Sequence, residues 1–340
     1  MSGVILLEGD PYSRGLAQAR ACPEMVEAVR RAVRVRLSER ALDSPAARAF
    51  LAAQGAWTER HAPEAMAEIR GIAAGFGLGR DDVFAFLHAH ILADLAAAPA
   101  AADGCSAFAR SGVLAKNRDV RPDLSPLQRL FLLRDPAWGK RSVLALGSLG
   151  APGAYSSGMN SDGLAVADTQ IPTIDHGRGI LRYLLMNRLL ATCSRVTEAL
   201  AAIAALPQAG GGALVIADAT GAVAAAELRY RRVDVERGAW VARTNHYTVV
   251  ADRLPHVPHS DARLAVLRAL VAAGTRPEAI LAHRGPGEPL CRPAGDAGPT
   301  IAGAIWETRA PAARIAFGPP AAVPWRAFRF ADGEWRETHA

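Results

Sequence analysis

The stretch Asp103-Gly104-Cys105-Ser106-Ala107-Phe108 marks the point where the character of the sequence changes. Before it lie Ala-rich segments whose apolar residues have helical spacing, ending in the small-residue run 97–102. After it come short apolar runs separated by Gly, Pro and Asp, which are typical of strands. A strand that begins with a cysteine directly after a glycine therefore divides a helical first third from a strand-rich remainder.

Around this division, apolar spacing predicts the individual elements. Helices are expected over 11–40, 45–61, 63–76, 81–97, 179–191, 194–206, 261–273 and 277–282. Strands are expected over 4–7, 105–109, 112–116, 130–133, 142–146, 155–160, 164–169, 213–217, 222–228, 231–235, 240–244, 300–306, 313–317 and 327–330. Because strands and helices do not alternate strictly, the sequence predicts an α+β protein with helices covering antiparallel sheets, and not a doubly wound parallel sheet.

The composition is that of a globular protein that binds neither nucleic acid nor membrane. Half of the 340 residues are hydrophobic and 21% are charged, which excludes a disordered chain. The formal charge of +6 comes almost wholly from scattered Arg, so the sequence predicts no nucleic-acid-binding patch. No apolar run is long enough to span a bilayer, and the first ten residues lack the basic start of a signal peptide. We therefore expect a cytoplasmic protein that binds neither nucleic acid nor membrane.

Cysteine and histidine positions give no metal-binding pattern. The four cysteines, at positions 22, 105, 193 and 291, are far apart and form neither a metal-type pair nor a disulfide-type cluster. His88 and His90 would lie on different faces of a helix. His256 and His259 have metal-like spacing but no acidic or Cys partner nearby. The sequence therefore predicts no metal and no cofactor.

A cysteine released as a new N-terminus carries both a nucleophile and a base. The thiol of Cys105 would attack, and its own α-amine, with an ordinary pKa of about 7.7–8.0, would accept the proton near neutral pH. Gly104 suits the cleavage that releases it, because a residue without Cβ lets the scissile peptide adopt a strained conformation. The alternative is that Cys105 is a small buried residue at the start of a strand.

Two further stretches supply partners for this chemistry. Asp119 ends the segment that follows the first predicted hairpin, so it can return beside Cys105 and hold the α-ammonium. Asn245 follows a predicted strand, and its amide N–H could stabilise an oxyanion, which contributes several kcal/mol when water is excluded. The alternatives are a solvated charged turn for the first stretch and an ordinary Asn/His turn for the second.

Four motifs together carry a resemblance to a known family. They are Asp103-Gly104-Cys105-Ser106, Asn117-Arg118-Asp119, Gly158-Met159-Asn160-Ser161-Asp162-Gly163-Leu164 and Thr244-Asn245-His246. In order and approximate spacing, the chain resembles the isopenicillin-N acyltransferase (acyl-coenzyme A:6-aminopenicillanic-acid acyltransferase)-like family of cysteine N-terminal-nucleophile hydrolases. The opening Gly9-Asp10-Pro11-Tyr12-Ser13-Arg14-Gly15 is similar to the start of this family's pro-region, so the resemblance covers nearly the whole chain.

The resemblance implies a four-layer αββα sandwich made as a self-cleaving precursor. Cleavage between Gly104 and Cys105 would leave residues 1–104 attached as a helical pro-region, the α-subunit, with 105–340 as the catalytic β-subunit. Cys105 would be nucleophile and base, Asp119 would orient the amine, and Asn245 would help to form the oxyanion hole. By the same resemblance, the late active-site arginine is expected at Arg309, with Arg314 as the alternative.

The resemblance also indicates where this chain departs from its relatives. Gln170 stands where relatives carry a second oxyanion Asn, and Lys116 stands where relatives carry an Arg. Together with His246, these two residues are expected to contact substrate.

The expected function is hydrolysis or transfer of an acyl group from a small amide or acyl thioester, through an acyl-enzyme on Cys105. Whether water or an amine accepts the acyl group stays open at this point. Two alternatives are an unprocessed, non-enzymatic αββα scaffold and a Cys-His hydrolase that uses His246 as base on an uncut chain.

Overall fold

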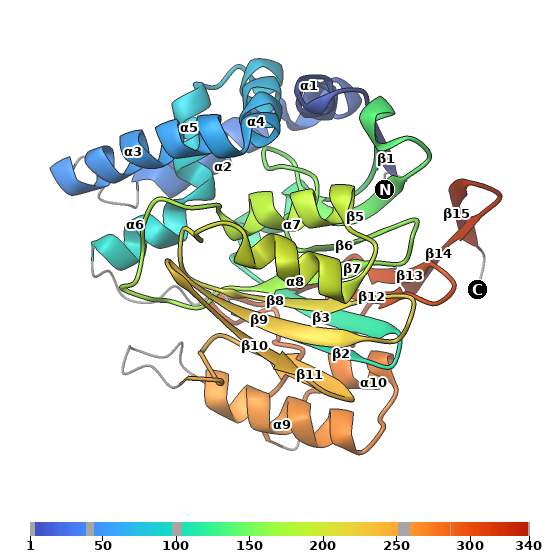
Figure 1. Cartoon of the computed structure of the whole chain (residues 1–340). Coiled ribbons are helices and arrows are strands. Elements are labelled where there is room, and N and C mark those ends of the chain that lie inside the picture. The colour runs from blue at the N-terminus through green and yellow to red at the C-terminus, as the bar shows by residue number, and fades with distance from the viewer. Residues whose placement is uncertain (1–3, 39–43, 97–103, 251–258, 286, 339–340) are drawn as a thin grey trace.

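The protein is built from two β-sheets that lie face to face, with helices on the outer face of each (Figure 1). The computed structural model describes residues 4–38, 44–96, 104–250, 259–285 and 287–338. Of the residues considered above, Asp103, the run 97–102, His256 and positions 39–40 of the helix expected over 11–40 lie outside these ranges. The layers follow in the order helix, sheet, sheet, helix, so the predicted four-layer αββα sandwich is confirmed.

The first sheet has eight strands in the order β1-β4-β5-β6-β7-β8-β9-β10. Their bounds are β1 Ile5–Glu8, β4 Gln128–Arg134, β5 Ser142–Ser148, β6 Ser157–Asn160, β7 Ala165–Thr169, β8 Ala213–Ala217, β9 Val223–Arg229 and β10 Arg232–Arg237. All neighbours are antiparallel except β1 and β4, which are parallel. A purely antiparallel sheet was therefore the wrong expectation at this edge, because β1 is joined to β4 only through a long, mainly helical crossover.

The second sheet has seven strands in the order β11-β2-β3-β12-β13-β14-β15. Their bounds are β2 Gly104–Arg110, β3 Val113–Asp119, β11 Trp240–Arg243, β12 Thr300–Glu307, β13 Ala312–Ala316, β14 Trp325–Ala331 and β15 Glu334–Thr338. The strand that begins at Gly104 is thus paired on both sides. The sequence did not predict β15, because Trp335 is its one buried residue and four of its five side chains are exposed.

Ten α-helices occur among the described residues. Their bounds are α1 Pro11–Ala21, α2 Val26–Ser38, α3 Pro45–His61, α4 Pro63–Phe76, α5 Arg80–Leu87, α6 Ala89–Leu95, α7 Arg182–Thr192, α8 Val196–Ala204, α9 Ser260–Ala272 and α10 Pro277–Leu281. The single helix expected over 11–40 is in fact broken at Cys22, because Pro23 has no N–H to continue it. The helix expected over 81–97 is likewise interrupted at His88.

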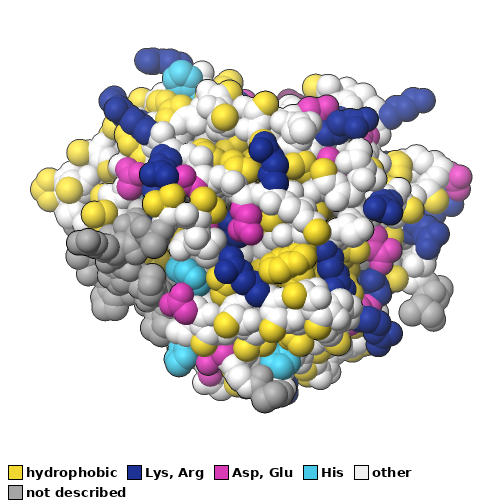
Figure 2. Space-filling view, turned by 60° about the horizontal axis from the view of Figure 1, so that its bottom comes forward, with side chains coloured by type: hydrophobic (Ala, Val, Ile, Leu, Met, Phe, Trp, Pro, Cys, Tyr) yellow, Lys and Arg dark blue, Asp and Glu magenta, His cyan; other side chains and the backbone are white. Residues whose placement is uncertain are grey.

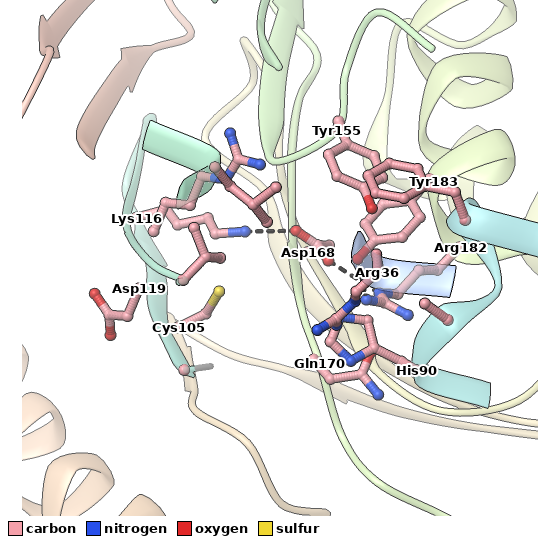
Figure 3. Close-up of a pocket in the computed structure, with 16 residues that line it drawn as sticks. Arg36, His90, Cys105, Lys116, Asp119, Tyr155, Asp168, Gln170, Arg182 and Tyr183 are labelled. Carbon is pink, nitrogen blue, oxygen red and sulfur yellow. Dashed lines mark hydrogen bonds and ion pairs between the residues drawn. The ribbon is translucent and has the colours of Figure 1, made fainter. Parts of the chain in front are cut away.

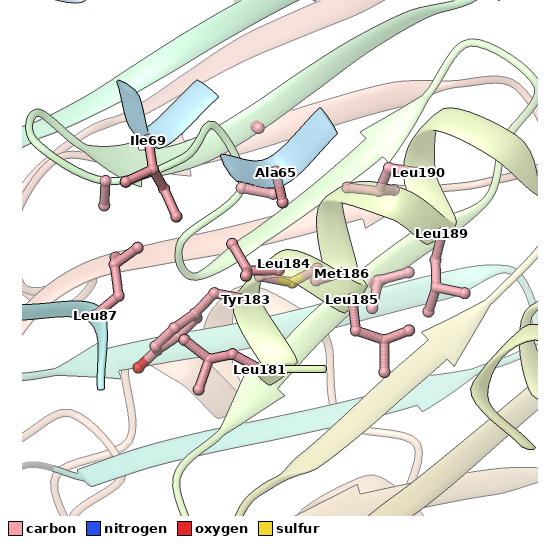
Figure 4. Close-up of a cluster of buried hydrophobic side chains, with 14 of the residues drawn as sticks. Ala65, Ile69, Leu87, Leu181, Tyr183, Leu184, Leu185, Met186, Leu189 and Leu190 are labelled. Carbon is pink, nitrogen blue, oxygen red and sulfur yellow. The ribbon is translucent and has the colours of Figure 1, made fainter. Parts of the chain in front are cut away.

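Three separate hydrophobic clusters account for the layers. One joins the first sheet to α1, α2, α4, α5, α7 and α8; Figure 4 shows its part around α7, where Tyr183 and Leu184 belong to the same cluster as Ile69 of α4. A second cluster fills the space between the sheets and contains Trp306. A third joins the second sheet to α9 and α10. Burial on both faces of each sheet explains why most strands are buried along their whole length.

The described residues before Gly104 pack tightly against the first sheet. Helix α1 crosses α4 so closely that a Cβ on Gly15 would lie 2.3 Å from the Glu68 carbonyl oxygen. Arg14 of α1 is buried, donates a hydrogen bond to Asp135, and lies 4.7 Å from the Trp138 ring centroid. Together with β1, these contacts fix the N-terminal segment to the first sheet.

Two further observations concern the charged surface and the helices. On the face that Figure 2 shows, basic and acidic side chains of the described residues are interspersed. Within the described ranges, no helix is both long and apolar enough to cross a membrane.

Candidate active site

Strands β2 and β3 bring the two ends of the predicted motif together. They form a hairpin in which Cys105 is directly opposite Arg118 and Gly104 is directly opposite Asp119. The turn at Ser111 and Gly112 has positive φ angles of 36° and 82°, as a tight hairpin requires. The structure therefore places the Asp119 motif beside the Gly104–Cys105 peptide, at the end of the hairpin away from its turn.

The side chains of this hairpin divide between two faces. Directly opposite residues point to the same face of a sheet, as do residues two apart, so Cys105, Lys116 and Arg118 share the face toward the first sheet. Asn117 and Asp119 point to the other face; the Asn117 side chain donates to the carbonyl oxygens at Leu281 and Leu290. The Cys105 thiol and the Asp119 carboxylate therefore lie on different sides of the second sheet.

On the thiol side, a chain of buried charges lies next to Cys105 (Figure 3). Lys116 Nζ donates to Asp168 Oδ1 at 2.5 Å, and Arg182 Nε donates to Asp168 Oδ2 at 2.9 Å. Burial alone would raise the pKa of Asp168, but the two cations together hold that pKa below its ordinary value. Neither Asp168 nor Arg182 was predicted from the sequence, because the ion pair of Asp168 with Lys116 forms only where the two sheets pack together.

The residue Cys105 is 8% exposed. Burial raises the pKa of Cys105, Lys116 opposes this effect, and Asp168 and Asp119 reinforce it. Since the thiolate is the nucleophile, Cys105 in the uncut chain is a neutral thiol at pH 7 and needs a base.

Asn245 approaches the same residue from the nitrogen side. Its Oδ1 accepts a hydrogen bond from the Cys105 backbone N–H at 3.0 Å, and its Nδ2 donates to the Gln170 carbonyl oxygen at 2.8 Å. A backbone N–H can only donate and a carbonyl can only accept, so the orientation of the amide is fixed. Asn245 therefore directs its oxygen toward the Cys105 nitrogen, while the N–H expected in an oxyanion hole binds Gln170.

Asp119 is fully buried near the peptide between Gly104 and Cys105. Its Oδ1 accepts from Thr300 Oγ1 at 2.6 Å. Its Oδ2 accepts no hydrogen bond from the described residues and lies 4.0 Å from Arg263 Nη1. Burial raises the pKa of Asp119, and Arg263 opposes that rise.

Two arginines that the sequence did not single out surround Gly104. Arg263 of α9 donates to the Cys105 carbonyl oxygen at 2.9 Å and to Asn245 Oδ1 at 2.6 Å. A Cβ added to Gly104 would lie 3.3 Å from Arg263 Nη2 and 3.3 Å from Arg292 Nη1. A side chain at position 104 would therefore press against both guanidinium groups. This steric restriction favours glycine here, in addition to the conformational freedom that cleavage requires.

Arg309 and Arg314 do not lie at this site. Arg309 contacts Gly112 and Gly221 at the turn end of the hairpin, about 20 Å along the strand from Cys105. Arg314 pairs with Glu278 and Glu307. The prediction failed because β12 runs antiparallel to β3: its first residue, Thr300, lies at the site, and its last lies at the far end.

Of the other residues expected to contact substrate, Gln170 lies at the pocket and His246 does not. Gln170 lines the pocket beside Cys105, and its buried Oε1 has no partner among the described residues. His246 lies outside the described lining of that pocket, with Nδ1 2.7 Å from Ser260 Oγ and Nε2 3.0 Å from Asp261 Oδ1. This arrangement gives no support to a Cys-His pair.

The pocket at Cys105 is narrow in the uncut chain. Its volume is about 40 Å³, enough for only a few water molecules, whereas small-molecule sites typically occupy roughly 300–1,000 Å³. Gly104 is part of its wall. In the described part of the chain, no three His, Cys, Asp or Glu side chains gather in a way that could hold a metal ion.

The two-sheet sandwich and the cysteine-centred hairpin together define an N-terminal-nucleophile type of amidohydrolase or acyltransferase. The family is shown by a match of residues 107–322 to the model described as acyl-coenzyme A:6-aminopenicillanic acid acyl-transferase. This match spans well over half of the chain, so the chain belongs to that family. The chain is accordingly an enzyme of the hydrolase or acyltransferase class that acts on amide bonds.

Similar solved structures are more distant. A conjugated bile acid hydrolase from Clostridium perfringens is 12% identical, with a TM-score of 0.45, and the match covers 70% of this chain and 97% of the other. A penicillin V acylase from Agrobacterium tumefaciens is 13% identical, with a TM-score of 0.41 and coverage of 69% and 86%. No curated protein matches the chain.

Proposed function

We propose that the chain cleaves itself between Gly104 and Cys105 and then acts as a cysteine amidohydrolase or acyltransferase. One observation carries this proposal: beside Gly104 lies a buried carboxylate oxygen that accepts no hydrogen bond from the described residues. Asn245 Oδ1 already takes the single N–H of the Cys105 nitrogen, while the buried Asp119 Oδ2 beside Gly104 accepts nothing from the described residues. An α-ammonium has three hydrogens to donate, so cleavage would supply the donor that this buried carboxylate lacks.

The cleavage can be written with its atoms balanced. Cys105 Sγ attacks the Gly104 carbonyl carbon and gives up its thiol proton. The C–N bond breaks once the Cys105 nitrogen has taken up that proton, which leaves a thioester and a free α-amine. Water then hydrolyses the thioester, so that Gly104 ends as a carboxylate and Cys105 regains its thiol. Arg263 and Arg292, which flank Gly104, lie where they can offset the negative charge that develops at this carbonyl.

The same groups then serve turnover. Release of Gly104 removes part of the wall of the narrow pocket, which makes room for substrate. The α-amine accepts the thiol proton, the thiolate attacks the substrate carbonyl, and the ammonium returns the proton to the leaving amine. The acyl-enzyme on Cys105 then passes its acyl group to water or to an amine. Asn245 and Asp119 hold the amine in place, and Asn245 Nδ2 becomes an oxyanion donor once it leaves the Gln170 carbonyl.

Residues 1–104 would remain bound as the α-subunit. The parallel pairing of β1 with β4 and the buried contact of Arg14 with Asp135 both support this, because neither depends on the Gly104–Cys105 bond. The substrate would be a small amide or an acyl thioester, the two kinds of acyl donor that suit a cysteine nucleophile.

Intact-mass analysis of the purified protein tests the cleavage. Wild type is expected as two fragments, the larger beginning at Cys105, and Cys105→Ala is expected as one uncut chain because it lacks the nucleophile. Cys291→Ala serves as the control, since this cysteine is also buried but does not line the pocket at Cys105. It is expected to cleave like wild type. An uncut wild-type protein with full amidase activity would overturn the proposal.

A further inference from the structure

Arg118 is a buried cation whose partners are all neutral. It is 3% exposed; its Nη1 donates to Gln128 Oε1 at 3.4 Å and to the Gly147 carbonyl oxygen at 3.3 Å, and its Nη2 donates to Ser148 Oγ at 2.9 Å. No carboxylate of the described residues pairs with it. Burying a charge without an opposite charge is costly, so such a guanidinium indicates an anion that the folded chain does not itself supply.

The surrounding charges reinforce this imbalance. Lys116 and Arg182 share one carboxylate, Asp168, so with Arg118 the thiol side of the pocket has three cations against one anion among these residues. The Arg118 guanidinium carbon lies 5.6 Å from the Tyr155 ring centroid, and the centroids of Tyr155 and Tyr183 are 4.2 Å apart with the ring planes inclined at 39°. The result is a positively charged subsite with an aromatic wall.

The chemistry determines which half of a substrate meets this subsite. The leaving amine receives its proton from the Cys105 α-amine, so it must lie on the nitrogen side, near Asn245. The acyl group must then extend on the thiol side, where Arg118 lies. Because Cys105 and Arg118 are directly opposite on neighbouring strands and line the same narrow pocket, an acid group would follow the reacting carbonyl after only a few carbons.

We propose that Arg118 binds a carboxylate on the acyl group, so that the enzyme prefers short dicarboxylic acyl chains over neutral ones. This inference rests on the proposed function, because it takes Cys105 as the nucleophile and its amine as the base. The alternative is that Arg118 offsets the negative charge of the Cys105 thiolate and not that of a substrate carboxylate; Lys116 already faces this thiolate.

A matched pair of substrates distinguishes a substrate carboxylate from the Cys105 thiolate as the anion that Arg118 faces. The p-nitroanilides of glutaric acid and pentanoic acid have the same five-carbon acyl length and differ in the terminal carboxylate. We expect kcat/KM of the cleaved wild type to be at least about 100-fold higher for the glutaryl substrate, since a site built to bind a polar group rejects an analogue that lacks it. Arg118→Met should lower that ratio at least about tenfold, and Arg118→Lys, which keeps the charge, should lower it less.

Arg70→Leu is the matched control. Arg70 is an exposed arginine that pairs with Glu59, so this variant should preserve both the rates and their ratio. Equal turnover of the two substrates by wild type, or a parallel loss on both in Arg118→Met, would overturn the inference. The parallel loss is the result expected if Arg118 offsets the charge of the thiolate.

A second measurement does not need turnover. Alkylation of Cys105 in the cleaved protein is compared for iodoacetate, which is anionic, and iodoacetamide, which is neutral. We expect the rate ratio of iodoacetate to iodoacetamide to fall several-fold in Arg118→Met, and an unchanged ratio contradicts the inference. A protein that neither cleaves itself nor hydrolyses any amide would contradict the proposed function. An active, cleaved protein without the acyl preference would contradict only the role of Arg118, so the two outcomes are distinguishable.

Discussion

In the uncut chain, Asn245 Oδ1 accepts the single hydrogen of the Cys105 nitrogen, and Asp119 Oδ2 lies beside Gly104 without a donor among the described residues. Burial raises the pKa of Asp119, and Arg263 only partly opposes this. An ammonium formed at Cys105 would bring a positive charge to this carboxylate and lower its pKa. By the same interaction, the carboxylate would raise the pKa of the ammonium, so the two groups titrate as a coupled pair.

Asp119→Asn tests this coupling through the pH dependence of the cleaved enzyme. The amine must be neutral to act as base, so kcat/KM falls at low pH as the amine becomes protonated. Removing the carboxylate's charge lowers the pKa of the amine, and we expect the acid limb of the profile to move down by about one pH unit. Asp123→Asn, a change at a more exposed carboxylate that pairs with Arg121, is expected to leave the limb in place. A limb that stays fixed in Asp119→Asn argues against the role of Asp119.

At the level of elements, the N-terminal strand and helix depend on one buried ionic cluster. Arg14 of α1 binds Asp135 and lies 3.6 Å from Glu68 of α4. Burial raises the pKa of Glu68, and Arg14 is the strongest influence against that rise. Two carboxylates therefore depend on one guanidinium, which holds α1 between α4 and the turn after β4.

Arg14→Met is expected to destabilise the protein by about 3–5 kcal/mol, because it leaves two buried carboxylates without their cation. Urea unfolding of the variant and wild type measures the difference. Arg80→Ala removes a guanidinium from an exposed pair with Asp81, so its effect should stay within about 0.5 kcal/mol. Similar midpoints for Arg14→Met and Arg80→Ala would show that the cluster contributes little.

At the level of the whole molecule, the site is assembled from both sides of the proposed cleavage point. Pocket residues Arg36 and His90 come from the helical segment, while Asp168 and Arg182 come from the first sheet and α7. The cluster between the first sheet and its helices also mixes residues from before and after Gly104. The two halves therefore share one hydrophobic core, and cutting a single peptide bond removes none of that burial.

The cleaved protein is accordingly expected to behave as one particle. Both fragments should elute together in size-exclusion chromatography at neutral pH, and they should unfold in a single thermal transition. Separation should require denaturant. Fragments that separate under native conditions, or that unfold in two resolved transitions, would contradict a shared core.

Much of the architecture follows from patterns that are local in the sequence. Helices α3 and α4 have the bounds expected for them, because proline and capping signals start them and left-handed Gly77 ends α4. The hairpin that joins Cys105 to Asp119 also follows from the sequence, since a short turn between two apolar runs fixes which residues become neighbours. Family resemblance extended this reading to the four layers.

Local patterns failed where distant segments meet. Arg309 was expected at the site because it is a late arginine near a turn, yet strand direction places that turn at the opposite end of the sheet. Arg263 and Asp168 gave no signal, because one is a single arginine on a helix and the other a single aspartate in a buried strand.

The sequence by itself determined the strand that starts at Cys105, the hairpin behind it and the class of chemistry that they suit. These depend on residue types and on neighbours only a few positions away. The tertiary structure alone decided which charges face Cys105, which way Asn245 is turned, and that Arg118 is buried without a carboxylate among the described residues. Such properties depend on how the two sheets pack and on which side chains this packing shields from water. No local sequence pattern encodes either of these.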